Sequence, residues 1–110
     1  MTTLLSMYVG MGLLLAIIAL PLYFEKIPPN GLYGFRVKKT MENPDIWYPV
    51  NKYSSRWLIA AGIIMALSAV GLSFFPGISL DVYSIACLAV FTGIFAIGMA
   101  STVRYMNSLK

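Results

Sequence analysis

Three long stretches of this sequence contain no charged residue, and they limit what the chain can fold into. Residues 1–24, 57–80 and 82–103 lack Asp, Glu, Lys and Arg altogether. The hydrocarbon layer of a membrane is about 30 Å thick and takes roughly 20 helical residues to cross, a length that each stretch reaches. With 59% apolar residues and a mean hydropathy of +0.79, the chain is also too apolar for a soluble domain. The sequence therefore predicts an integral membrane protein with three transmembrane helices.

The spans are expected to be helices rather than the strands of a membrane barrel. Barrel strands alternate apolar and polar residues over about 10 positions, whereas residues 13–18 read LLLAII without alternation. The first span lacks a basic segment before it, which favours a retained helix over a cleaved signal peptide. We expect one all-α membrane domain, residues 1–110, with spans at about residues 4–24, 57–75 and 80–103.

Basic residues are confined to one side of this predicted membrane domain. The loop at residues 25–56 and the C-terminal tail share a side, and together they hold all 8 Lys and Arg residues. Short cytoplasmic segments carry the excess of Lys and Arg in membrane proteins. We therefore expect a multi-pass protein of the cell (plasma) membrane with its N-terminus outside and its loop and C-terminus in the cytoplasm. The loop is too short for a nucleic-acid-binding module, so anionic lipid headgroups are the expected partner of its positive charge.

Groups that catalysis or metal binding require are scarce. The chain has no histidine and one cysteine, Cys87, which falls within the third span and is expected to pack as a small side chain. The acids available on the loop side are Glu25, Glu42 and Asp45, and they form no recognisable triad, metal site or phosphate loop. We predict no metal, cofactor or catalytic residue, which disfavours an enzyme. The spans contain no ionisable acid or base, which disfavours a transporter.

Small residues recur four positions apart within the spans. The pairs are Gly12/Ala16, Gly62/Ala66, Ala89/Gly93 and Gly98/Thr102. Such spacing lets membrane helices approach closely. Two interpretations stay open: packing inside the three-helix bundle, and the interface of a homo-oligomer.

The loop contains residues that are typical of turns and of helix starts, which indicates a folded segment. Residues 28–31 read PPNG, a combination of residues that favours a turn. Residues 43–45 read NPD, an N-cap followed by a proline at the first helical position and an acid near the positive end of the helix dipole. We expect a short helix at about residues 44–55, with Pro49 causing a kink or a break before the second span.

Two interpretations of this loop are open. It is either a connector whose basic side chains reach the headgroups, or a structured cytoplasmic site where polar and aromatic groups converge near the membrane surface. In the second case Arg36 suits a phosphate or a carboxylate. The residues that would converge are Asn30, Arg36, Trp47 and Asn51.

These residues resemble the motif of the SdpI family of bacterial and archaeal membrane proteins. That motif is an asparagine, then Gly-x-Arg, then a threonine, then Trp-x-x-x-Asn before a hydrophobic span. In this chain it reads NGLYGFRVKKT over residues 30–40 and WYPVN over residues 47–51. Pro49 is a departure from the pattern, while the placement between the first two spans fits it. The residues that the resemblance assigns to a ligand- or partner-binding site are Asn30, Gly34, Arg36, Thr40, Trp47 and Asn51.

The resemblance also implies a function. The family is named for an immunity protein against a secreted toxic peptide, a longer protein with additional spans that also tethers a repressor at the membrane. This chain resembles the core module, which implies a non-enzymatic membrane protein in resistance to, or sensing of, membrane-active toxic peptides. Its partner would be such a peptide or another protein. The alternative is a protein that binds or processes anionic lipid through the basic loop.

Overall fold

Three long helices make up most of the protein. The computed structural model describes residues 2–30 and 34–109. Helices α1 (Thr2–Tyr23), α3 (Pro44–Leu72) and α4 (Leu80–Ser108) are long and apolar enough to cross a membrane, and the short helix α2 (Lys38–Glu42) lies between the first two. These described residues contain no strand. The prediction of an all-α protein with three spans is therefore confirmed.

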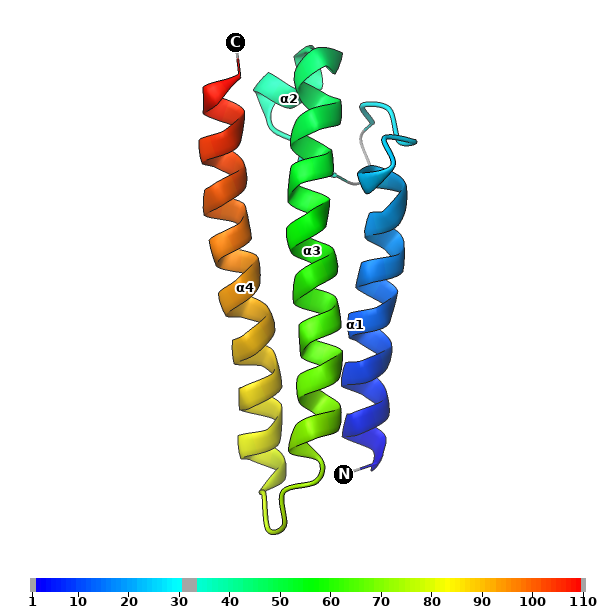
Figure 1. Ribbon diagram of the computed structural model, residues 1–110, viewed down its shortest axis with the longest axis vertical. Coiled ribbons are helices and arrows are strands. Elements are labelled where there is room, and N and C mark those ends of the chain that lie inside the picture. The colour runs from blue at the N-terminus through cyan, green and yellow to red at the C-terminus, as the bar shows by residue number, and fades with distance from the viewer. Residues whose placement is uncertain (1, 31–33, 110) are drawn as a thin grey trace.

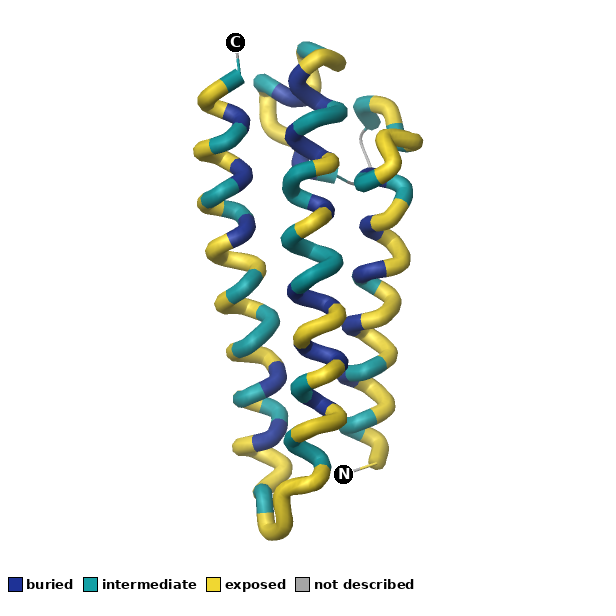
Figure 2. Tube along the Cα trace, in the orientation of Figure 1, coloured by how far each residue is buried: buried dark blue, intermediate teal, exposed yellow. Residues whose placement is uncertain are grey.

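Helix α3 is the centre of the bundle. It packs between α1 and α4 and runs antiparallel to both (Figure 1). The segment that joins α1 to α3 and the C-terminal end of α4 lie at one end of the bundle, which we call the loop end. The start of α1 and the α3–α4 turn lie at the opposite end, the turn end. Buried residues lie mainly where the helices meet, and the outward faces of α1 and α4 are exposed, as expected of surfaces that face lipid (Figure 2).

Helices α3 and α4 are longer than the membrane is thick. Each has 29 residues, which at 1.5 Å per residue is about 44 Å, against about 30 Å of hydrocarbon. About 14 Å of each helix can therefore project beyond the membrane core. The polar residues of both helices are concentrated at the loop end, so the projecting parts lie there and form a platform for the loop.

Helix α3 continues through Pro49. The sequence predicted a short helix at about residues 44–55, with a kink or a break at Pro49 before the second span. The break is wrong, because these residues form the first part of α3 itself, and the kink stays a prediction. Pro49 removes one backbone hydrogen bond, to the carbonyl one turn earlier. Pro49 is the sixth residue of α3, and the N–H of Trp47 before it already bonds to the carbonyl of Asn43, so the missing bond is a real loss inside the helix. The fully buried side chains of Trp47 and Val50 hold this turn against its neighbours.

Small residues allow close contact inside the bundle. A Cβ added at Gly12 would collide with the carbonyl oxygen of Gly62, and one added at Gly62 would collide with that of Gly12. In α4, a Cβ at Gly98 would lie 2.5 Å from the Cβ of Trp57. These glycines therefore serve packing between the helices of one chain. Gly93 has no atom within 4 Å of such a Cβ, so a homo-oligomer interface on that face of α4 stays a prediction.

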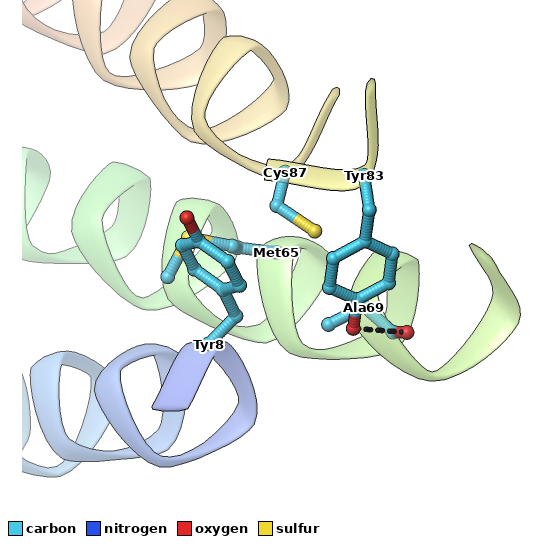
Figure 3. Close-up of a cluster of buried hydrophobic side chains, with 5 residues drawn as sticks. All are labelled: Tyr8, Met65, Ala69, Tyr83 and Cys87. Atoms are coloured by element: carbon cyan, nitrogen blue, oxygen red, sulfur yellow. Dashed lines mark hydrogen bonds between the residues drawn. The ribbon is translucent and has the colours of Figure 1, made fainter. Parts of the chain in front are cut away.

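A buried cluster at the turn end joins all three long helices (Figure 3). Its members are Tyr8, Met65, Ala69, Tyr83 and Cys87. The Tyr83 hydroxyl donates a hydrogen bond to the carbonyl of Ala69 at 2.8 Å, and the Tyr83 ring lies 6.1 Å from the Tyr8 ring. Cys87 is buried as a small packing side chain. The turn end is therefore fixed by packing, and the loop end carries most of the polar structure.

Candidate functional site

Asn51 fastens the loop to α3. Its side chain is only 2% exposed, and its Oδ1 accepts a hydrogen bond from the backbone N–H of Phe35 at 2.5 Å. Its Nδ2 donates to the carbonyls of Trp47, at 3.0 Å, and Phe35, at 3.5 Å. The amide thus pairs with both backbone groups of Phe35, much as a neighbouring strand would. Only a side chain with an acceptor and a donor on one planar group can do this.

Gly34 allows the chain to pass over α3 just before Phe35. Its φ is +118°, a conformation that side-chain-bearing residues rarely adopt. A Cβ at this position would lie 2.8 Å from Oδ1 of Asn51 and 3.0 Å from Cη2 of Trp47. Both the backbone angle and the space therefore require glycine. Because Gly34 has no Cβ, the side chain of Asn51 has room to reach the backbone of Phe35.

Thr40 shapes the segment after Phe35. Its side chain is fully buried, and its hydroxyl oxygen accepts a hydrogen bond from the N–H of Val37 at 3.0 Å. The single hydroxyl hydrogen can go to the carbonyl of Phe35, at 2.8 Å, or to that of Val37, at 2.9 Å. This closes the turn that begins α2. Phe35 is thereby held from both sides, by Asn51 and by Thr40.

Trp47 ties down the segment on the other side of residues 31–33. Its ring is fully buried, and its Nε1 donates to the carbonyl of Ile27 at 2.7 Å. Asn30 makes a local hydrogen bond, from Nδ2 to the carbonyl of Pro28 at 2.8 Å. The turn expected at Asn30-Gly31 lies partly outside the described residues. The indole therefore joins the end of the α1 exit segment to the start of α3.

Arg36 differs from the other motif residues because its side chain is exposed. It directly follows Phe35, which is buried against Ile46, Val50 and Met106. The backbone position of Arg36 is therefore set by an anchored neighbour.

Lys39 is a loop residue that the sequence-based site did not include. Its Nζ donates to the carbonyls of Met106 and Leu109, at 3.1 Å each. Helix α4 has no basic residue in its own last turn, and a cation there satisfies carbonyls left without partners. The absence of a basic residue from the last turn of α4 could have indicated that a cation from elsewhere caps this helix. Nothing in the sequence identified Lys39 as that cation.

The structure thus brings Gly34, Thr40, Trp47 and Asn51 together around Phe35, and it places Arg36 on the surface beside them. Phe35 itself was missed by the sequence-based site. It lies in a small apolar cluster, and its role depends on residues far away in the chain. The candidate site is therefore better described as a fixed loop that presents Arg36 than as a pocket lined by all six motif residues.

An apolar hollow lies below this loop. It has a volume of about 260 Å³ and is bordered by all three long helices. Gly34 and Phe35 form its rim on the loop side, and Leu22, Leu58 and Phe95 are among its apolar walls. The described residues contain no group of His, Cys, Asp and Glu side chains that could hold a metal ion.

A family model and a curated relative match this chain. The model of the SdpI/YfhL protein family matches residues 26–104, which include α2, α3 and all of the loop except Glu25. The chain is 31% identical over 58 residues to the uncharacterized protein YfhL of Bacillus subtilis (strain 168), and this match covers 53% of each protein. The chain thus spans about half the length of that relative. No solved structure matches it at a significant level. The chain is a multi-pass membrane protein with three candidate spans, and it belongs to the SdpI/YfhL protein family.

Proposed function

We propose that this protein acts in resistance to, or sensing of, membrane-active toxic peptides as a non-enzymatic module of the cell membrane. The family resemblance motivates the proposal, because the family takes its name from an immunity protein. The observation that carries it is the loop between α1 and α3, where Asn51, Thr40 and Trp47 are all buried and hydrogen-bonded to loop backbone. A plain connector needs no such anchoring, whereas a recognition surface must keep its shape.

The chemistry offered by this surface suits an amphipathic peptide. The hollow of about 260 Å³ beside Phe35 can take an apolar side chain from the membrane side. The exposed Arg36 guanidinium can meet a carboxylate at the membrane surface. The confinement of Lys and Arg to the loop and the C-terminal tail supports a cytoplasmic position for this surface.

The test is survival of a susceptible bacterium that expresses the protein and is challenged with a panel of membrane-active peptides. We expect the wild-type protein to raise survival and Arg36→Ala to remove most of that protection at an equal membrane level. Arg104→Ala is the matched control, because Arg104 is an exposed arginine at the same end of the bundle. Equal survival with and without the wild-type protein across the panel would refute the proposal.

Binding of phospholipid is the second candidate. The segment around α2 is a weaker candidate for lipid binding than the sequence suggested, because Lys39 already donates hydrogen bonds to carbonyls at the end of α4. Exposed cations next to aromatic rings occur instead on α3, at Lys52 and Arg56. Both residues belong to the basic segment 25–56 that the sequence assigned to lipid, and they favour the part of it that lies on α3 as the candidate lipid site.

A further inference from the structure

A groove that the site described above does not use runs along α3 at the loop end. Two hollows, of about 310 and 340 Å³, share Tyr53 and Arg56 as walls and therefore lie next to each other along α3. We call the two together the α3 groove. Its outer part is bordered by Glu25, Pro49, Lys52, Tyr53, Arg56 and Tyr105, and its inner part by Tyr53, Arg56, Trp57 and Ala60.

The walls of the α3 groove change from charged to apolar along its length. Lys52 and Arg56 are exposed and lie one helical turn apart. The rings of Tyr53 and Tyr105 stack with centroids 4.6 Å apart and an interplanar angle of 10°. Trp57 begins the second charge-free stretch of the sequence. Arg56 therefore lies at the edge of the hydrocarbon layer, with aromatic rings at the headgroup level, where they are favoured.

The charges follow a definite order along the membrane normal. Gly12 of α1 meets Gly62 of α3, and nearer the loop end the Nζ of Lys52 lies 5.2 Å from the centre of the Tyr23 ring. Glu25 follows Tyr23 as the chain leaves the membrane, so it lies at or beyond the level of Lys52. Arg56 lies about 6 Å deeper than Lys52, given a rise of 1.5 Å per residue. From the membrane outward the order is thus an apolar wall, then Arg56, then Lys52 with Glu25 at or beyond its level.

Glu25 occupies a backbone position that normally belongs to glycine. The N–H of Lys26 bonds to the carbonyl of Pro21, and the N–H of Glu25 bonds to that of Leu22, which is the Schellman arrangement at a helix C-terminus. Glycine is usual at the left-handed residue of this motif, but here it is Glu25, with φ of +59°. A side chain kept in an unfavourable backbone conformation is a pointer to function, and this side chain borders the groove.

We propose that the α3 groove binds a membrane phospholipid whose headgroup carries a phosphate and, further out, a primary amine. The phosphate lies between Arg56 and Lys52, and the ammonium group meets the Glu25 carboxylate. The first part of an acyl chain follows Trp57 and Ala60 into the bilayer. Among the residues that the structure describes, no ion pair joins Glu25 to Lys52 or Arg56, so all three charges can face a ligand.

This inference rests on the second candidate function, phospholipid binding, and is independent of the proposed function in peptide resistance. Arg36, Phe35 and the hollow below them involve a different set of residues from the α3 groove. Loss of lipid binding through Arg56 with peptide protection intact would separate the two sites, as would the reverse result with Arg36.

The test uses the full chain, purified in detergent and stripped of lipid, and native mass spectrometry to measure the Kd of added lipids. The probes are phosphatidylethanolamine and phosphatidylglycerol, which share the phosphate but differ in the amine, together with inorganic phosphate. We expect Arg56→Gln and Lys52→Gln each to weaken phosphatidylethanolamine binding about fivefold, the equivalent of about 1 kcal/mol per basic residue at a membrane surface. Arg36→Gln and Lys38→Gln, which remove the same charges from the loop, should leave this Kd unchanged.

The amine contact has its own test. Glu25→Gln should weaken phosphatidylethanolamine severalfold and leave phosphatidylglycerol unchanged or tighter, because the carboxylate meets only the amine. Inorganic phosphate at millimolar concentration should not compete. Equal loss of both lipids in Glu25→Gln would overturn the amine contact. A stronger effect from Arg36→Gln than from Arg56→Gln, with circular dichroism showing all variants folded, would overturn the site.

Discussion

Replacing Asn51 by alanine should release the loop from α3. The substitution leaves the N–H of Phe35 without its acceptor in a buried position, and an unsatisfied buried donor costs about 1–3 kcal/mol. The bonds from Nδ2 to the two carbonyls are lost as well. We therefore expect the docked loop to lose about 2–3 kcal/mol relative to the undocked one. At 1.4 kcal/mol per factor of ten, the undocked population rises by about 30- to 150-fold.

Hydrogen exchange of backbone amides measures this population directly. When the loop opens and closes faster than exchange occurs, the exchange rate of the Phe35 amide is proportional to the open fraction. That rate should rise by the same factor in Asn51→Ala, while amides in the middle of α4 keep their protection. Ser54→Ala is the control, because it removes one hydrogen bond, from Ser54 to the carbonyl of Asn51 at 3.2 Å, on the same helix. Unchanged protection of Phe35 in Asn51→Ala would refute the reasoning.

Three further substitutions test other parts of the account. Gly62→Ala should destabilise the bundle by about 1–3 kcal/mol, because the added methyl meets the backbone of Gly12, and a lower midpoint in detergent unfolding would show it. Lys39→Met should cost about 0.5–1 kcal/mol and increase exchange only in the last turn of α4; equal protection there would contradict the capping role. Glu25→Gly should stabilise the fold by about 1 kcal/mol, since glycine adopts the positive φ without strain, and a lower unfolding midpoint would argue against that.

The membrane-spanning part of the fold could be predicted because a single large free-energy cost, that of placing a charge in hydrocarbon, determines it. Charges are excluded from hydrocarbon, so the three charge-free stretches mark the spans directly. The continuous α3 was harder to foresee, since Pro49 locally opposes a helix. Packing of Trp47 and Val50 outweighs the one lost hydrogen bond, and that packing is not visible in a local sequence pattern.

The loop shows the same division between local and distant determinants. Asn43 was identifiable as an N-cap because its partner, the N–H of Asp45, is two residues away. Gly34 was identifiable only through the family resemblance, because the reason for glycine lies in the side chains of Trp47 and Asn51. Helix α2 escaped prediction for a similar reason. It has five residues and no hydrophobic period, and it is held by Thr40 and Lys39.

Chemical labelling of one cysteine tests the central claim that the basic loop is a cytoplasmic surface. Lys38→Cys in a Cys87→Ala background places the only thiol at an exposed position of α2. Phe74→Cys in the same background is the control, because Phe74 is 80% exposed at the turn end. We predict that a membrane-impermeant thiol reagent labels position 74 in intact cells and labels position 38 only after permeabilisation. Labelling of position 38 from outside intact cells would contradict the account.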